Sequence, residues 1–329
     1  MDFMVIGLGS MGRRRIRLIK QLSGEHSAVG VDNNPGRRSQ AEEELNIRTF
    51  DTIGEAFEEA HPQAAIVSTS PLSHADIIEK CLMLGCHVFT ELNLTDDRYG
   101  SNIRLAKDKN LVLFLSSTFL YREEIRYIRE RTGQMQGRLN YYYHVGQYLP
   151  DWHPWESIKD YFVGDKRTNG CREIFAIELP WLVKVFGDII SYRVMSSKNT
   201  DLPIDYNDNY MLLTEHSGGN KGVLMVDVVS RKPVRNLEIF GENLFISWDG
   251  SPKGLYEYDI EEKKDKNIDI YDSVDKLDGY AVFVIENDYL NELKAFIGTI
   301  EGTAEPEYTF EEDEGILKMI DKIEAGEDL

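Results

Sequence analysis

The feature that most constrains the fold is the order of short segments between Met1 and Asp32. An apolar run, Phe3 to Ile6, leads directly into the glycine-rich segment Gly7-Leu8-Gly9-Ser10-Met11-Gly12. The residues up to Leu22 then place apolar side chains on one face of a helix, and a second apolar run ends at Asp32. Strand, tight turn, helix, strand and acid in this order predict a dinucleotide-binding unit.

Each part of this unit has a physical role. Gly7 makes the turn, Gly9 lets backbone N–H groups approach a pyrophosphate, and Gly12 lets helix and strand pack closely. Asp32 can accept hydrogen bonds from ribose hydroxyls and would repel the 2′-phosphate of NADP, so NAD is favoured. Arg37 and Arg38 follow and could offset that repulsion, which leaves NADP possible. The predicted cofactor-binding residues here are Gly7, Leu8, Gly9, Ser10, Met11, Gly12, Asp32, Asn33 and Arg37.

Length and composition set broader limits. A chain of 329 residues exceeds one typical core and predicts two domains. The formal net charge of −20 argues against nucleic acid and anionic membranes as partners. We find no apolar run of the roughly 20 residues that span a bilayer and no room for a signal peptide before the first strand, so we expect a cytoplasmic protein. The three cysteines are too few and too irregularly spaced for a disulfide framework or a zinc site, so buried thiols and no metal are expected.

The order of predicted elements indicates an α/β fold. Apolar strands alternate with helices, among them 37–44, 73–84 and 97–109, up to about residue 115, which predicts a doubly wound parallel sheet. After Tyr121 come a helix near 123–131, a tyrosine-rich strand at 138–148 and a helix at about 173–186. Several β-type runs after residue 190 predict a largely antiparallel meander. We therefore expect a cofactor domain at 1–119 and a second α/β domain at 120–329, and leave open whether the last helix packs on the first domain.

Five motifs together resemble one known family over essentially the full length. They are Gly7 to Gly12; Ser68-Thr69-Ser70-Pro71 with His74; Gly85 to Val88 running into Glu91; the helix from Cys171 to Gly187; and the closing helix that ends at Glu324-Ala325. The family is that of glucose–fructose oxidoreductase and inositol dehydrogenase (Gfo/Idh/MocA). The resemblance implies a Rossmann domain, then an α/β domain with an open, mainly antiparallel sheet whose exposed face commonly forms homodimers or homotetramers. It also implies hydride transfer between NAD(P) and a sugar or cyclitol hydroxyl, with cofactor contacts from Ser68, Thr69, Ser70, Pro71, His74, Glu91 and Asn93.

The sequence departs from the family at the catalytic positions. The family's Glu-Lys-Pro stands here as Glu91-Leu92-Asn93, so the lysine that serves the proton relay is missing. The second-domain motif usually carries an aspartate and, four residues later, a histidine. These positions correspond to Glu173 and Ile177, with Glu178 the nearest carboxylate to the lost histidine.

The segment from His144 to Glu156 is the predicted source of a replacement relay. His144, Tyr148 and His153 can exchange protons with a hydroxyl, and they join Glu173 and Glu178 as catalytic candidates. Asp151, Trp152 and Trp155 could bind a sugar, since indole faces stack on sugar rings. The alternative is that the aromatic residues pack a domain interface and the histidines are satisfied polar groups. Lys166, Arg167 and Arg172 could hold a phosphate or carboxylate of the substrate, or could be solvated or ion-paired.

The sequence thus favours an NAD(P)-dependent oxidoreductase acting on a sugar-like, possibly nucleotide-sugar, alcohol or ketone through a non-standard proton relay. Two alternatives stay open. The first is a non-catalytic NAD(H)-binding sensor or subunit, suggested by the missing lysine and histidine. The second is a lyase or epimerase that recycles its NAD.

Overall fold

A computed structural model describes residues 1–22, 24, 26–276 and 284–329 of the chain. These residues form two compact units. The first unit comprises Met1–Thr118 and Tyr289–Glu314, and the second comprises Phe119–Asp288 and Gly315–Leu329. Both units therefore contain residues that are far apart in the sequence, and the last helix begins in the first unit and ends in the second.

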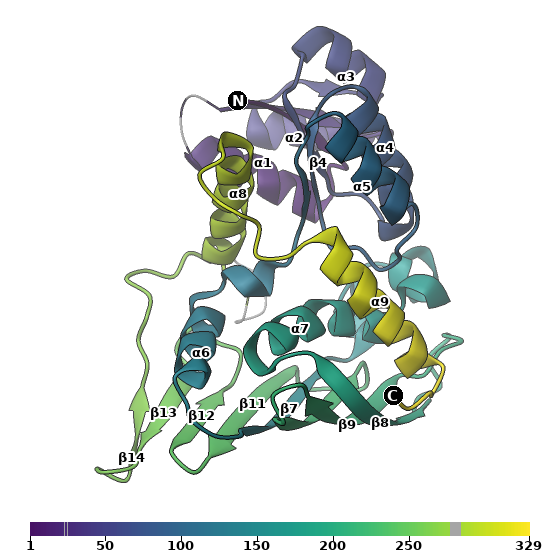
Figure 1. The fold of residues 1–329 in the computed structure, drawn as a ribbon. Helices are drawn as coiled ribbons and strands as arrows, with labels where there is room; N and C mark the ends of the chain where they lie inside the picture. Colours follow the sequence, from purple (N-terminus) through teal and green to yellow (C-terminus); the bar gives the residue numbers. More distant parts are fainter. Residues whose placement is uncertain (23, 25, 277–283) are drawn as a thin grey trace. The chain divides into compact units, whose positions relative to one another are not determined.

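The first unit is built on a six-stranded sheet in the order β3-β2-β1-β4-β5-β6 (Figure 1). All neighbouring strands are parallel, which confirms the predicted doubly wound sheet. The strands are β1 Asp2–Ile6, β2 Ser27–Val31, β3 Thr49–Phe50, β4 Ala64–Val67, β5 His87–Thr90 and β6 Leu113–Leu115.

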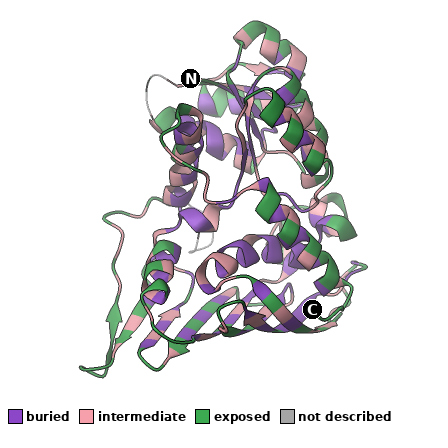
Figure 2. Cartoon of the chain, viewed as in Figure 1, coloured by how far each residue is buried: buried purple, intermediate pink, exposed green. Residues whose placement is uncertain are grey.

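Helices cover both faces of this sheet. In Figure 1, α4 and α5 lie on one side of it and α1 and α8 on the other. The helices are α1 Ser10–Leu22, α2 Pro35–Leu45, α3 Ile53–Ala60, α4 His74–Met83, α5 Tyr99–Asp108 and α8 Glu286–Glu301, with the short 3₁₀ helix η1 Pro71–Ser73 before α4. Burial on both faces explains why β4 is apolar at every position and fully buried (Figure 2).

Two helices of the first unit begin at other residues than predicted, for local reasons. Helix α2 begins at Pro35 because Asn34 caps it, accepting backbone N–H groups of Gly36 and Arg37. Helix α5 begins at Tyr99 because Arg98 adopts a left-handed conformation with φ of 60° that ends the preceding turn. Neither difference moves a predicted site residue.

The second unit is built on an eight-stranded sheet in the order β14-β13-β12-β11-β7-β10-β9-β8. Its strands are β7 Asn140–Gly146, β8 Ile189–Ser197, β9 Asn209–His216, β10 Lys221–Asp227, β11 Val234–Gly241, β12 Leu244–Trp248, β13 Leu255–Asp259 and β14 Lys264–Asn267. The expected second sheet is confirmed, and it is mostly antiparallel.

The prediction of a simple meander was wrong in one respect. Strand β7, which precedes the other seven in the chain, lies between β11 and β10 and pairs with β10 in parallel. The connection from β7 to β10 includes helix α7 and strands β8 and β9, and it brings β10 beside β7 in the same direction. The meander pattern does not reveal that insertion. Strands β13 and β14 were also not predicted. Strand β14 consists of exposed Lys, Asp and Asn residues, so it has no apolar alternation that would indicate a strand.

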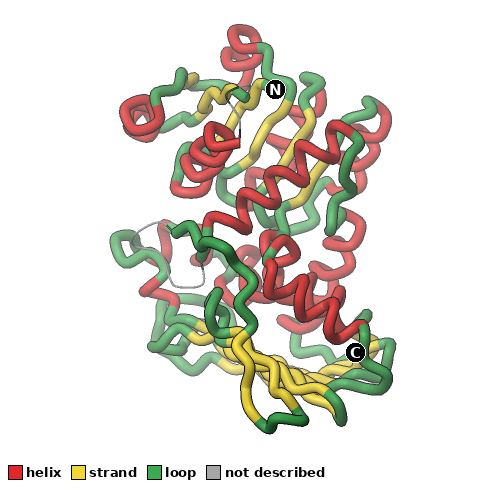
Figure 3. The backbone as a smooth tube through the Cα atoms, turned by 90° about the vertical axis from the view of Figure 1, so that its left-hand side faces the viewer, coloured by secondary structure: helices red, strands yellow, loops and turns green. Residues whose placement is uncertain are grey.

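One face of the second sheet is packed under helices and the other is open (Figure 3). The helices are α6 Glu123–Gly133, α7 Gly170–Phe186 and the end of α9 Phe310–Glu324. Side chains alternate along β7: the Tyr141 ring stacks on Phe186 of α7, and the Tyr143 ring meets Trp181 edge-on, whereas Tyr142 is exposed. Helix α7 begins at Gly170, earlier than predicted, because Asn169 accepts the backbone N–H of Arg172.

Several short 3₁₀ turns connect β7 to α7, where the sequence indicated only a loop: η3 Leu149–Asp151, η4 Ile158–Asp160, η5 Phe162–Gly164 and η6 Lys166–Thr168. Cys81, Cys86 and Cys171 are buried thiols. Within the described part of the chain, no helix combines the length and apolar character needed to span a bilayer. In the same residues, no group of three or more His, Cys, Asp or Glu side chains is arranged to hold a metal ion.

Candidate active site

The glycine loop of the first unit has the geometry of a phosphate cradle. Gly7 has φ of +89°, and a Cβ there would lie 2.6 Å from the Ser68 carbonyl oxygen. A Cβ on Gly12 would lie 1.8 Å from the Gly7 carbonyl oxygen, so helix and turn require glycine at both positions. A Cβ on Gly9, by contrast, would meet no described atom within 4 Å. The loop is therefore tight at its base and leaves space at Gly9, where the amino terminus of α1 favours an anion.

Asp32 is held against this loop at the end of β2. Its Oδ2 accepts the backbone N–H of Leu8 at 2.8 Å, and its Oδ1 accepts that of Asn34 at 2.8 Å. The Arg37 guanidinium lies 3.8 Å from the carboxylate, while Arg38 donates to the Asp32 carbonyl and to Asp51. Asn33 is exposed beside them. The carboxylate is fixed by the loop, in the arrangement expected of a ribose acceptor.

His74 and Asn93 fix the loop at Ser68-Thr69-Ser70-Pro71. The His74 ring is buried, with Nε2 at 3.0 Å from the Thr69 carbonyl and Nδ1 at 2.7 Å from the Asn93 amide. Burial lowers the pKa of His74, and its contacts with Asn93 and Thr69 oppose that shift only in part. Nε2 faces the Thr69 carbonyl oxygen and Nδ1 faces the Asn93 Oδ1 atom, so the ring is held from both sides. Asn93, which stands where the family has proline, thus has a specific partner.

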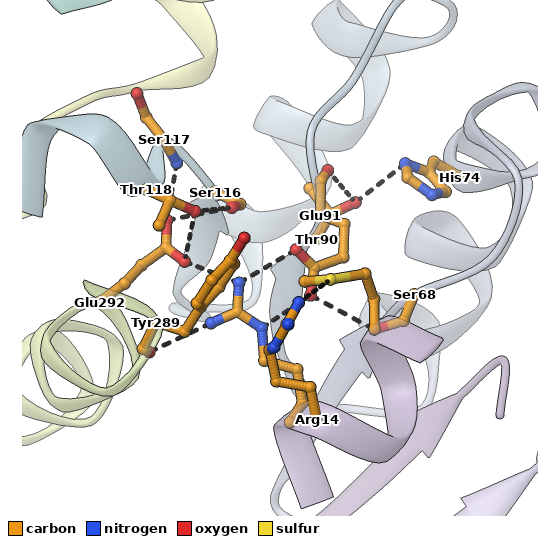
Figure 4. Close-up of polar contacts among 12 residues, drawn as sticks. Arg14, Ser68, His74, Thr90, Glu91, Ser116, Ser117, Thr118, Tyr289 and Glu292 are labelled. Atoms are coloured by element: carbon orange, nitrogen blue, oxygen red, sulfur yellow. Dashed lines mark hydrogen bonds and ion pairs between the residues drawn. The ribbon is translucent and has the colours of Figure 1, made fainter. Parts of the chain in front are cut away.

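Glu91, at the end of β5, is bound by an arginine that the sequence analysis did not single out. Arg15 of α1 donates from Nε to Glu91 Oε1 at 2.7 Å and from Nη2 to Oε2 at 3.0 Å. The Ser68 hydroxyl lies 3.4 Å from the same carboxylate. Figure 4 draws this contact as a dashed line. The signal that could have revealed Arg15 is its place next to Ile16 on the buried side of α1, where an unpaired charge would be costly. Leu92, in place of the family's lysine, is half-buried.

In the second unit, Glu173 is an unusual carboxyl group. It lies in the first turns of α7, and its Oε2 is buried without a hydrogen-bond partner among the residues that the structure describes. Burial raises the pKa of Glu173 to about 7. An unpaired carboxyl group with a pKa near neutrality has the property required of a general acid or base.

Glu178, one and a half turns further along α7, is the opposite case. Its Oε2 accepts the Tyr143 hydroxyl and the Trp181 indole N–H, both at 2.7 Å, and its Oε1 accepts Arg235 at 2.6 Å. Its side chain is fully buried. Every donor around it is a fixed side chain, so the carboxylate serves as an anchor that joins α7 to β7 and β11.

Tyr161 lies close enough to feel the charge of Glu173, and it belongs to a cluster of aromatic rings. The His153 ring stacks on Tyr161 with centroids 3.9 Å apart, and the Trp155 ring lies 5.1 Å from His153. Burial and the charges of Glu173 and Glu156 raise the pKa of Tyr161. His153 also contacts Glu156 at 3.3 Å. Tyr161 is therefore a second residue that sequence reasoning missed, because nothing in its local pattern separates it from a packing tyrosine.

The structure does not bring His144 together with the carboxylates of α7. Tyr141 and Tyr143 point toward α7, and neighbouring side chains of a strand alternate between its two faces. His144 therefore lies on the open face of the sheet, as Tyr142 does. There its Nε2 lies 2.7 Å from Asp227 Oδ2, and Asp227 also accepts N–H groups of Val229 and Ser230. Burial would raise the pKa of Asp227, but these donors outweigh it and lower the pKa. Tyr148 is covered by the Arg231 guanidinium at 3.7 Å.

The residues predicted to bind substrate fall into two groups. Asp151 is exposed, Trp155 is 78% exposed, and Trp152 is half-buried with its indole N–H donated to the Gln147 carbonyl. Arg172 is buried and ion-paired with Asp321 and Glu324 near the end of α9, while Lys166 and Arg167 are exposed. Lys166 lines a cavity of about 400 Å³ in the second unit, whose other walls include Asn169, Lys198, Tyr206, Tyr210 and Glu324.

The glycine loop, Asp32 and the parallel sheet are the features of a nucleotide-binding Rossmann fold. Residues 1–115 match the model of a family described as an oxidoreductase family with an NAD-binding Rossmann fold, GFO_IDH_MocA. The matched residues include the glycine loop, Asp32, Thr69 and Glu91. Over these residues the chain is similar to the Gfo/Idh/MocA oxidoreductase family, in agreement with the resemblance seen in the sequence. A search of the curated proteins finds no match.

Solved structures share the whole fold at low sequence identity. An oxidoreductase from Agrobacterium radiobacter, in complex with NAD⁺, L-tartaric acid and magnesium, has a TM-score of 0.81 and 13% identity and covers 100% of this chain and 98% of its own. UDP-N-acetylglucosamine 3-dehydrogenase GnnA from Acidithiobacillus ferrooxidans has a TM-score of 0.74 and 18% identity, with coverage of 99% and 97%. The WlbA dehydrogenase from Bordetella pertussis, in complex with NADH and UDP-GlcNAcA, has a TM-score of 0.79 and 15% identity, with coverage of 99% and 95%.

Proposed function

We propose that this protein is an NAD(H)-dependent dehydrogenase or reductase of a sugar-like alcohol or ketone, with Glu173 as the proton partner of hydride transfer. The single observation that carries the proposal is the buried and unpaired Oε2 atom of Glu173, together with a pKa that is raised to about 7. The similarity of the first unit to the family supplies the redox chemistry. Glu173 occupies the position that corresponds to the family's aspartate.

The described residues fit the cofactor. Space at Gly9, the amino terminus of α1 and the fixed carboxylate of Asp32 would hold the pyrophosphate and the adenosine ribose. Thr69, positioned by His74, and Glu91, positioned by Arg15, would contact the nicotinamide half. When bound, the nicotinamide accepts or supplies the hydride. The exposed Arg37 leaves NADP as a second, weaker cofactor.

Glu173 accepts the proton when the substrate is oxidised and donates it when the substrate is reduced. In oxidation, the substrate carbon loses a hydride, the hydroxyl O–H bond breaks, and the proton passes to the ionised carboxylate of Glu173. In reduction, the protonated carboxyl group returns that proton to the carbonyl oxygen as the hydride arrives. A pKa near the operating pH serves both directions, because each protonation state is populated. We place His153 and Tyr161 beside this group as stacking and orienting residues, and we assign Glu178 to the fold.

The substrate class rests on similarity and on the cavity beside α7. GnnA and WlbA, whose folds this chain shares, are dehydrogenases, and GnnA is named for a nucleotide sugar. The cavity combines amide, ammonium and carboxylate groups with two tyrosine rings, a composition that suits sugar hydroxyls. We infer a sugar or nucleotide-sugar substrate.

The open face of the eight-stranded sheet suggests self-association. Large apolar side chains are exposed on it, among them Tyr142, Met195, Met211, Leu213 and Phe240. Met211 pairs with Met195 and Leu213 with Val223 across neighbouring strands, so these residues form a continuous surface. Apolar surface of this extent is typical of an interface. We propose a homodimer or homotetramer, with the chain divided functionally into a cofactor domain at 1–119 and a substrate and assembly domain at 120–329.

The test is turnover of the unaltered protein and of Glu173→Gln across a panel of sugars and nucleotide sugars with NAD⁺ and NADH. We expect a loss of about 10²–10⁴-fold in kcat for Glu173→Gln, the usual contribution of a general acid–base, with NADH affinity unchanged. Glu130→Gln, an exposed glutamate on α6, is the matched control and should retain full activity.

Three outcomes would contradict the proposal. Full activity of Glu173→Gln would remove Glu173 from the mechanism. NADH binding without turnover on any substrate would favour a sensor or subunit. Product formation with no net change in NADH would indicate a lyase or epimerase that recycles its cofactor.

A further inference from the structure

Arg15 is a fully buried cation on the helix that begins at the glycine loop. It lies three residues after Gly12, and its side chain has no solvent exposure. Its guanidinium lies 4.4 Å from the centroid of the Phe89 ring. Burying a charge in such surroundings is costly unless the charge is paired, so its partners define its role.

The first partner is Glu91, and the contact is bidentate. Nε and Nη2 of Arg15 donate to separate oxygens of Glu91, at 2.7 and 3.0 Å. This fork geometry fixes the plane of the carboxylate as well as its position, which a lysine could not do. Glu91 keeps 13% of its side chain exposed, so the carboxylate is held rigid while one edge remains accessible.

The second partner holds Arg15 from the opposite side. Nη2 of Arg15 donates to Glu292 of α8 at 2.6 Å, and Nη1 donates to the Tyr289 carbonyl at 3.2 Å. Glu292 in turn accepts the Ser116 hydroxyl at 3.0 Å and the Ser117 backbone N–H at 2.7 Å (Figure 4). Arg15 is thereby held at α8, and Glu292 in turn is held by the residues that follow β6.

We propose that Arg15 is a positioning residue that fixes the Glu91 carboxylate for the nicotinamide half of the cofactor, with Glu292 as the anchor that fixes Arg15. This inference rests on the proposed function. Helix α1, which would receive the pyrophosphate at its amino terminus, thus also positions the Glu91 carboxylate at the end of β5. Leu92 cannot form a polar contact where the family has lysine, so the orientation of Glu91 depends on Arg15.

The test is a double-mutant cycle in the full chain with Arg15→Lys, Glu91→Gln and both together. The dissociation constant of NADH and the emission maximum of bound NADH are measured for each. Arg15→Lys and Glu91→Gln should each weaken NADH binding about tenfold, the loss of one charge-assisted hydrogen bond. The double variant should also lose only about tenfold, because Arg15 acts through Glu91. Arg17→Lys, the same substitution on the same helix without a contact to Glu91, is the control and should bind as the unaltered chain does.

The outcomes separate positioning from stability. A loss of about 100-fold in the double variant would mean independent effects and would overturn the inference. A lowered Tm of Arg15→Lys with unchanged NADH affinity and emission would assign Arg15 to stability alone and would also overturn it. If Arg15→Lys does not fold, Arg15→Gln with Glu292→Gln preserves the cluster's net charge and should show the same loss of about tenfold in NADH affinity. If the unaltered chain binds no NADH, the proposed function fails and this inference fails with it, whereas binding with additive losses overturns this inference alone.

Discussion

Glu173 and Glu178 lie five residues apart on the same helix and have opposite surroundings. Glu178 is enclosed by Tyr143, Trp181 and Arg235, and each of its oxygens accepts a short hydrogen bond. Glu173 has a buried oxygen to which no described residue donates, and its pKa is raised to about 7. The comparison shows that burial alone does not make a carboxylate functional. A paired buried carboxylate stabilises the fold, and an unpaired one is available for proton transfer.

The largest stability effect should come from breaking the Glu178 pair. Arg235→Met would leave a buried carboxylate without its cation, and the free energy of unfolding should fall by about 3–5 kcal/mol. Urea unfolding followed by tryptophan fluorescence measures this directly, because all four tryptophans lie in the second unit. Arg193→Met, which removes an exposed ion pair with Asp328, should change stability by less than about 1 kcal/mol. Equal effects of the two substitutions would refute the distinction drawn for Glu178.

The pH dependence of stability should reveal Glu173. The pKa of Glu173 is raised in the folded chain. Between about pH 4.5 and pH 7, Glu173 is therefore ionised in the unfolded chain and still protonated in the folded chain. The cost of Glu173 to stability is therefore absent below pH 4.5 and complete above pH 7. Glu173→Gln should become more stable than the unaltered protein as pH rises across this window, by at most about 3 kcal/mol. Denaturation at pH 5 and pH 8 tests this, and a difference that does not change with pH would contradict the unpaired state of Glu173.

The smallest expected effect is the difference in unfolding free energy between substitutions of two tyrosines near these carboxylates. Tyr143→Phe removes a hydrogen bond to Glu178 and should cost about 1–2 kcal/mol of unfolding free energy. Tyr161→Phe should change stability by less than about 0.5 kcal/mol, since the Tyr161 hydroxyl forms no hydrogen bond with the residues in the described ranges. Thermal unfolding of the two variants side by side gives the difference. A larger loss for Tyr161→Phe would indicate that Glu173 has a partner after all.

The sequence by itself determined the cofactor half of this protein. The glycine loop, Asp32 and the alternation of apolar strands with helices depend on residues that are close in the chain, and local backbone requirements leave few alternatives at such positions. The motif loops at Thr69 and Glu91 were assigned to the cofactor from the family resemblance. The helix starts at Pro35 and Tyr99 were misplaced, because caps and a single left-handed residue decide them.

Only the tertiary structure decided the pairing of the charged groups. Arg15 meets Glu292 across 277 positions of the sequence, and Glu178 meets Arg235 across 57. His144 was separated from the α7 carboxylates by the alternation of β7, which places neighbouring side chains on opposite faces of the sheet. The role of a titratable side chain depends on its solvation and on partners within a few ångströms. These are fixed when distant segments pack together, and a linear pattern does not contain them.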